Sequence, residues 1–112
     1  MAIGARCGDP AGLCDSLRQS PLLAVLRPSS SARAQRQIDA VATAGFRHVE
    51  LAWTAEPWWL QLLLSLPNRW PELRFGVAGV RSAQQLVVVS EHGLCFAMSP
   101  ISCSLMWDQA DA

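Results

Sequence analysis

Four short apolar runs, each bounded by residues that interrupt regular structure, occur at similar intervals along most of the chain. They span residues 22–26, 46–53, 73–77 and 94–98. Runs of this length between breakers are typical of buried strands. A stretch with helical spacing separates each run from the next, so consecutive strands cannot form hairpins. The sequence therefore predicts a parallel sheet with right-handed crossovers.

The connecting segments carry start and stop signals for helices. These signals are Ser30 or Ser31 with Gly45, Thr54 with Pro67-Asn68, and Ser82 with His92-Gly93. Side chains of Ser and Thr accept hydrogen bonds from the first helical turn, and glycine ends a helix readily. Ser82 and Gln85 form a capping box, which outweighs the strand preference of the three valines that follow.

The alternation of strand and helix predicts an α/β protein built of parallel βα repeats. Its period is close to the roughly 30 residues of one unit in a (β/α)₈ TIM barrel, so four units make about half of such a barrel. An open flavodoxin-like sheet has a similar rhythm and is the alternative. Residues 1–112 are expected to form a single partial barrel domain, with a tail at 101–112 that has no predicted structure. Half a barrel exposes two sheet edges, and the tail is a candidate to cover one.

Composition and charge exclude several classes of function. The formal net charge is zero and the Arg residues are scattered, which argues against a nucleic-acid-binding surface. The longest apolar stretch, residues 58–66, is interrupted by Gln61 and Ser65 and is shorter than the ~20 residues that span a bilayer. No basic region followed by an apolar core opens the chain, so we expect no membrane association and a cytoplasmic location.

The cysteine and lysine content limits which metal sites, disulfides and reactive amines the chain can contain. The cysteines at 7, 14, 95 and 103 form no C-x-x-C pair and have no histidine at a zinc-ligand spacing. We therefore expect free thiols and no bound metal. All nine basic residues are Arg, and the chain contains no Lys. A coding bias toward GC-rich codons is one explanation for that absence.

One carboxylate interrupts the second apolar run. Glu50 lies between Val49 and Leu51, where strand alternation sends it to the same face as His48. Burial of an ionised carboxylate is costly unless the group is paired or used, so Glu50 is a candidate catalytic acid or base. The alternative is a glutamate at a strand end that reaches water, and the pattern alone favours neither.

Further candidates lie at the carboxyl ends of the strands, where chemistry is located in both architectures. Together with Glu50, they are Arg27, Thr54, Gly79 and Ser99. The guanidinium fork of Arg27 suits a carboxylate or phosphate, although an Arg in solvent at a strand end is the plain alternative. Thr54 fits the N-cap of the following helix better than a pocket.

Five segments in register resemble the bacterial 2-keto-3-deoxy-6-phosphogluconate (KDPG) and 4-hydroxy-2-oxoglutarate (KHG) aldolases. Ala-Val-Leu-Arg at 24–27 resembles the first strand of the family, and Ala-Gly-Phe-Arg-His-Val-Glu-Leu at 44–51 resembles its glycine turn and glutamate strand. Residues 76–80 occupy the place of the family segment Gly-Ala-Gly-Thr-Val, and Gln-Gln-Leu at 84–86 follows. Phe-Ala-Met-Ser-Pro at 96–100 is similar to the fourth-strand motif. The resemblance covers residues 22–100.

This resemblance implies a class I aldolase on a (β/α)₈ barrel. Such an enzyme cleaves a 2-keto-3-deoxy sugar acid to pyruvate and an aldehyde through a lysine Schiff base, with no metal or cofactor. By resemblance, Glu50 transfers protons, and Arg27, Thr54, Gly79 and Ser99 belong to the substrate site. The implied partners are a small keto acid or sugar acid and other copies of the chain, because family members are usually trimeric, or a missing second half.

The chain departs from the family pattern at two points. The family threonine that helps to hold the pyruvate carboxylate corresponds to Gly79, which has no hydroxyl. The family lysine lies on a strand beyond the fourth, and this chain ends near the middle of a barrel without any Lys. The resemblance therefore predicts an aldolase-family chain whose lyase activity needs a second half.

Two other functions stay open at this point. One is a non-catalytic protein, derived from the family, that binds a keto acid or takes part in an assembly. The other is a protein-interaction module built on tryptophan side chains, which are enriched in binding hot spots. The tryptophans are Trp53, Trp58, Trp59, Trp70 and Trp107. Core packing explains most of them already, so the interaction module ranks last.

Overall fold

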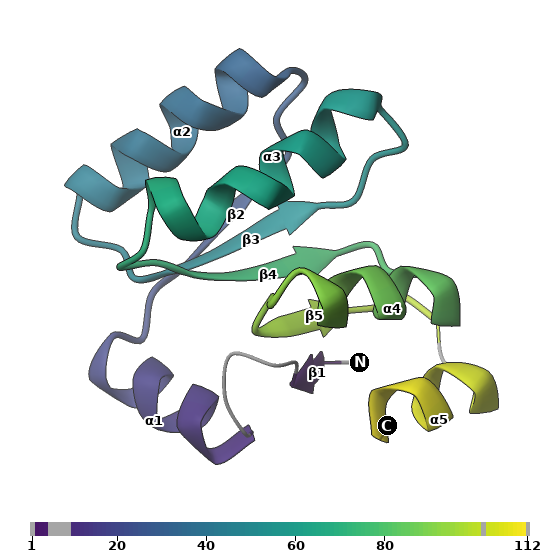
Figure 1. Cartoon of the computed structure of the whole chain (residues 1–112). Helices are drawn as coiled ribbons and strands as arrows, with labels where there is room; N and C mark the ends of the chain where they lie inside the picture. Colours follow the sequence, from purple (N-terminus) through teal and green to yellow (C-terminus); the bar gives the residue numbers. More distant parts are fainter. Residues whose placement is uncertain (1, 5–9, 102, 112) are drawn as a thin grey trace.

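The computed structural model of the chain describes residues 2–4, 10–101 and 103–111. Strands and helices follow one another along these ranges (Figure 1). The strands are β1 (Ala2–Gly4), β2 (Leu23–Leu26), β3 (His48–Ala52), β4 (Arg74–Ala78) and β5 (Phe96–Met98). The helices are α1 (Pro10–Gln19), α2 (Ser31–Thr43), α3 (Pro57–Arg69), α4 (Ala83–Glu91) and α5 (Ser104–Asp111).

The strands form one sheet in the order β1-β5-β4-β3-β2. Strands β2 to β5 run parallel, and one helix connects each to the next, which confirms the predicted parallel βα repeats. Strand β1 pairs antiparallel with β5. The sheet is not closed, since β2 forms one edge and β1 the other. This open arrangement is consistent with half a barrel and with an open sheet.

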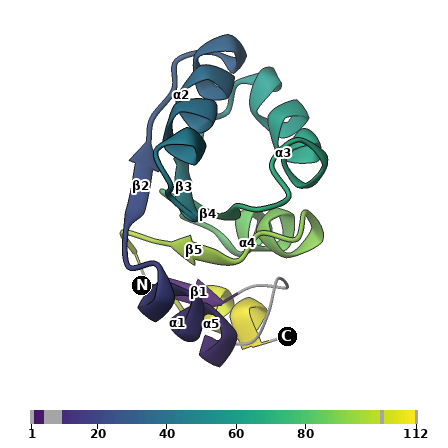
Figure 2. The same ribbon diagram turned by 90° about the vertical axis from the view of Figure 1, so that its left-hand side faces the viewer.

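The register places one residue from each parallel strand in a row across the sheet. Val25 pairs with Glu50, Glu50 with Gly76, and Gly76 with Phe96. Because side chains alternate along a strand, residues in such a row share one face. We call this the inner face. The opposite, outer face carries α2 and α3 (Figure 1), and a rotated view shows α1 on the other side of the sheet from these two helices (Figure 2).

The hydrophobic core fills the space between the outer face and its helices. Val49 and Leu51 of β3 are fully buried there, together with Ile38 of α2 and Trp59 of α3. The apolar stripe of α3 packs onto the sheet as its helical spacing predicts. Further core residues from this helix are Leu62, Leu63 and Leu66. The tryptophans at 53, 58, 59 and 70 all lie in this core or against it, which supports core packing over an interaction surface.

Helix ends agree with the sequence signals at most positions. Ser30 and Ser82 cap α2 and α4, and each hydroxyl oxygen accepts a 3.2 Å hydrogen bond from the backbone N–H three residues later. The side chain of Gln85 accepts a hydrogen bond from the N–H of Arg81, one residue earlier than a capping box requires. Gly45 follows the end of α2 with φ of +96°, a conformation that other residues rarely adopt.

The boundaries of α3 differ from those predicted. Thr54 is not its N-cap, because that position belongs to Glu56. The Thr54 hydroxyl accepts a 3.3 Å hydrogen bond from the N–H of Glu56 and so stabilises the turn before the helix. The helix also continues past Pro67 for two more residues. Its last turn is held because the buried Trp70 donates its backbone N–H to the carbonyl of Leu66.

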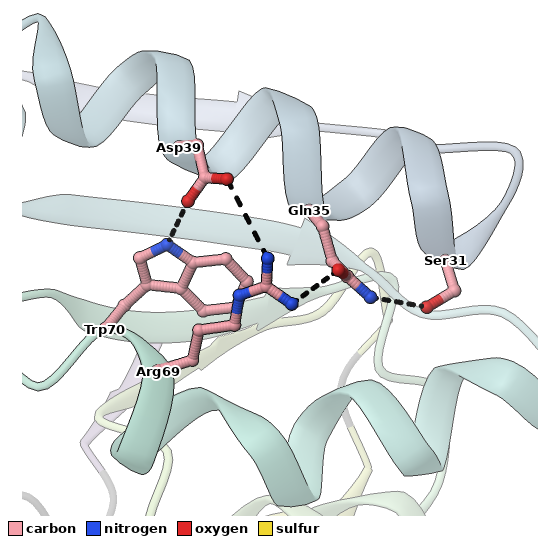
Figure 3. Close-up of polar contacts among 5 residues, drawn as sticks. All are labelled: Ser31, Gln35, Asp39, Arg69 and Trp70. Atoms are coloured by element: carbon pink, nitrogen blue, oxygen red, sulfur yellow. Dashed lines mark hydrogen bonds and ion pairs between the residues drawn. The ribbon is translucent and has the colours of Figure 1, made fainter.

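Polar side chains link α2 to the end of α3 (Figure 3). The indole nitrogen of Trp70 donates a 2.7 Å hydrogen bond to the Asp39 carboxylate. Arg69 approaches the second carboxylate oxygen of Asp39 at 3.9 Å and donates a hydrogen bond to Gln35. Gln35 in turn donates to the hydroxyl of Ser31. These contacts fix the angle at which the two helices lie over the sheet.

The segments at either end of the repeats behave differently from what was expected. The tail at 101–112 contains α5, which packs against α4 and buries Met106. Strand β1 occupies the edge beside β5, and neither β1 nor α1 was predicted. The edge at β2 stays open as predicted, and Leu22 and Val25 are 61% and 53% exposed there.

The thiol prediction holds for two cysteines and is wrong for a third. Cys14 and Cys103 are free and exposed. Cys95 is buried and disulfide-bonded. Cys7 lies outside the described residues.

Candidate functional site

Glu50 is the third residue of β3, on the inner face of the sheet. Only 7% of the residue is exposed, so Glu50 is largely buried. Within the described part of the chain its carboxylate has no hydrogen bond or ion pair. Burial raises the pKa of Glu50, while the positive charge of Arg27 acts in the opposite direction. An unpaired carboxyl with a raised pKa is suited to giving and taking protons.

Arg27 follows the last residue of β2, on the strand next to Glu50. Val25 and Glu50 pair in the register, so Arg27 lies two residues further along the same face of the neighbouring strand. The residue is exposed, and it forms no direct ion pair with Glu50 among the described contacts. The structure therefore brings Arg27 within electrostatic range of Glu50 and leaves the guanidinium free to meet an anion.

The other three sequence candidates lie at the same end of the sheet, but no hydrogen bond or ion pair given for the described residues joins them to Glu50. The hydroxyl of Thr54 is engaged in the turn before α3. The hydroxyl of Ser99 donates a 2.6 Å hydrogen bond to the carbonyl of Ile101 and accepts a 3.1 Å bond from its N–H. Gly79 has φ of +76°, which a β-branched threonine would adopt only with strain. These residues shape loops around the candidate site.

His48 lies on the inner face two residues before Glu50 and was not among the predicted site residues. It is fully buried, and its Nε2 lies 2.8 Å from the hydroxyl oxygen of Ser16 on α1. Burial lowers the pKa of His48 and nearby Arg74 lowers it further, while the backbone at Ser20 acts in the opposite direction. The shared alternation with Glu50 was the only sequence signal for this position, since Ser16 lies outside every motif.

Phe96 closes the inner face on the far side of Glu50. Gly76 separates the two residues in the row and has no side chain of its own. A Cβ atom added at Gly76 would overlap the aromatic ring of Phe96, so the ring lies directly over this glycine. Phe96 is 5% exposed. The carboxyl of Glu50 therefore has an aromatic neighbour on one side and Val25 on the other.

A separate cavity of about 290 Å³ opens at the other end of the strands. Its lining comes from the end of α3, the start of β4 and the end of α4. It includes Trp70, Phe75, His92 and Leu94 but not Glu50 or Arg27. Because neither Glu50 nor Arg27 lines the cavity, we do not assign it to their chemistry.

Neither a metal-ligand cluster nor a lysine is found among the residues that the structure describes. In residues 2–4, 10–101 and 103–111 no three His, Cys, Asp or Glu side chains gather as metal ligands. The sequence contains no Lys side chain that could condense with a carbonyl group. Among the helices in these ranges, none is long and apolar enough to cross a membrane. The site thus consists of a carboxyl group, a guanidinium and an aromatic wall.

Comparison with known proteins adds no assignment. A scan against protein-family models finds no match, and a search of curated proteins finds none either.

Proposed function

We propose that the chain supplies the acid–base part of a keto-acid aldolase site of the KDPG/KHG type. The observation that carries this proposal is the buried, unpaired carboxyl of Glu50 beside the charge of Arg27. An aldolase needs one group that moves protons at the keto carbon and one that holds the substrate carboxylate. Both kinds of group occur on adjacent parallel strands, in the order that the resemblance implies.

In this proposal Glu50 acts in two protonation states. As a neutral acid it donates a proton to the hydroxyl that leaves as water when an amine condenses with the keto group. As a carboxylate it accepts a proton from the carbon next to that group. Arg27 attracts the substrate carboxylate. The amine itself must come from outside this chain, because the sequence has no Lys.

Titration calorimetry with pyruvate tests the binding half of the proposal. We expect heat of binding with the wild-type chain and a loss of about tenfold or more in affinity for Arg27→Gln, since a charge-assisted contact is removed. Arg47→Gln, which removes an exposed charge at the opposite end of the sheet, is the matched control and should bind as wild type. A wild-type chain that gives no heat with pyruvate would contradict the proposal.

The acid–base half needs the missing amine, which methylamine can supply. Methylamine condenses with pyruvate and releases water, and a base then removes a methyl proton from the imine. In D₂O with both reagents, we expect the wild-type chain to accelerate deuterium exchange at the pyruvate methyl group, and Glu50→Gln to abolish the acceleration. NMR follows the exchange. Binding without exchange would instead favour the non-catalytic keto-acid-binding protein.

Borohydride trapping tests whether the chain by itself forms a Schiff base with pyruvate. With pyruvate and borohydride but no added amine, mass spectrometry should find no covalent pyruvate on a side chain, because the sequence has no Lys. A trapped adduct would contradict the proposal that the amine comes from elsewhere.

A further inference from the structure

We propose that Phe96 is a positioning residue that keeps water from the Glu50 carboxyl and thereby sets the pH range in which that group holds a proton. This inference rests on the proposed function, in which Glu50 acts as the acid and base. Its physical basis is the row across the inner face, in which a glycine stands between the aromatic ring and the carboxyl.

The first step is the position of the ring. Glu50 and Phe96 are separated by the single strand β4, and Gly76 is the residue of β4 that pairs with both. Neighbouring strands lie about 4.8 Å apart, so the two Cα atoms are on the order of 10 Å from each other. The ring of Phe96 covers Gly76 and so spans about half of this distance. Any side chain at 76 would displace the ring from this position.

The second step is what surrounds the carboxyl. On the side of β2, Val25 is 53% exposed and leaves water close by. On the side of β4 and β5, Gly76 and Phe96 are both buried. On that side the ring of Phe96 fills the space over Gly76, the residue next to Glu50 in the row. Desolvation favours the neutral form of a carboxyl group, which agrees with the raised pKa of Glu50.

The charged and titratable groups on the inner face do not account for the raised pKa of Glu50. Among the described residues, the strands contribute Arg27 after β2, His48 on β3 and Arg74 on β4. Helix α1, which packs on this face through Ser16, adds Asp15 and Arg18, which pair with each other in solvent. Arg27 lowers the pKa of Glu50 and so opposes the effect. Strand β5 contributes only Phe96 and Met98 to this face, and neither is charged. Within the described residues, burial rather than a like charge therefore raises the pKa of Glu50, and Phe96 is an apolar contributor to that burial.

The test is a carboxyl NMR titration of the full chain with ¹³C-labelled glutamate, in which Glu50→Gln identifies the Glu50 signal. We expect Phe96→Ala to shift the Glu50 titration midpoint to lower pH. Phe96→Leu should shift it part of the way, because a leucine side chain is too short to cover Gly76. Val77→Ala is the control, since it removes a buried side chain from the outer face of the adjacent strand and should leave the midpoint in place.

The outcomes are separable. If Phe96→Ala does not fold, the Phe96→Leu midpoint decides by itself. Midpoints equal to wild type in the folded Phe96 variants would overturn the inference, and so would an equal downward shift in Val77→Ala. The titration uses no keto acid. If calorimetry shows no pyruvate binding, the proposed function is contradicted, but the effect of Phe96 on the Glu50 titration can still be measured.

Discussion

Nε2 of His48 lies 2.8 Å from the hydroxyl oxygen of Ser16, so a fully buried imidazole joins α1 to the inner face of the sheet. Within the described chain the other ring nitrogen, Nδ1, is buried without a hydrogen-bond partner. Protonation of this ring would place an additional positive charge beside Arg74, which pairs with His48 in the register. The contact between α1 and the sheet is therefore sensitive to the charge on one histidine.

Acid should destabilise the fold through His48. Burial and Arg74 lower the pKa of His48 below its ordinary 6.5, so the folded state binds fewer protons than the unfolded state as the pH falls through 6.5. The free energy of unfolding is therefore highest above pH 6.5. It decreases on acidification until the pH reaches the folded-state pKa of His48. The slope can approach about 1.4 kcal/mol per pH unit. Urea unfolding of wild type and His48→Gln from about pH 8 to about pH 5 measures it. Equal slopes in the two proteins would contradict the assignment.

Replacing Glu50 by glutamine should stabilise the chain at neutral pH. Burial raises the pKa of Glu50 above its ordinary 4.5, so the folded carboxyl retains a proton that the unfolded one releases. Stability then falls as the pH rises from 4.5 to the folded-state pKa, and the penalty persists above it. We expect Glu50→Gln to raise the free energy of unfolding by about 1 kcal/mol at neutral pH. Replacing a destabilising functional residue commonly has an effect of this size. Chemical denaturation tests this, with the exposed Glu72→Gln as control. A loss of stability in Glu50→Gln would show that the carboxylate has a stabilising partner.

The sequence predicted those features that depend on local chemistry. The parallel strands and their connecting helices follow from short apolar runs and from signals such as Ser30 and Gly45, which act within a few residues. Glu50 stood out because a carboxylate in an apolar run is costly wherever the strand is buried. Thr54 was misplaced by two residues, because Thr can stabilise a turn as well as cap a helix.

Features that depend on long-range pairing were not predictable. Strand β1 adds to the edge of β5 from the opposite end of the chain, and three residues carry too little pattern to indicate this. The contact of His48 with Ser16 needs the packing of α1, and the position of Phe96 over Gly76 needs the register of β4 and β5. Each of these contacts joins two elements, and residue spacing within one element does not indicate which other element it will meet.

The link between α2 and α3 should be carried mainly by one hydrogen bond (Figure 3). Asp39→Ala leaves the buried indole N–H of Trp70 without its acceptor, which typically costs about 1–3 kcal/mol. Arg69→Ala should cost less than about 1 kcal/mol, because its ion pair with Asp39 is solvent-exposed. Urea unfolding of both variants gives the comparison.

A double-mutant cycle isolates this hydrogen bond. In a Trp70→Phe background no indole N–H is present, so Asp39→Ala should lose most of its effect. An unchanged cost in that background would mean that Asp39 stabilises the helix pair by another route.

Gly76 should tolerate no side chain while Phe96 is present. Its backbone does not require positive φ, so the cost of Gly76→Ala is steric, through overlap of the new Cβ with the ring of Phe96. Overpacking of this kind typically costs about 1–3 kcal/mol. The same substitution in a Phe96→Ala background should cost much less, because the ring that it meets has been removed. Denaturation midpoints of the wild type, both single variants and the double variant complete the cycle. Additive costs would show that the ring and the glycine are not in contact, and that Glu50 is screened from water by something other than Phe96.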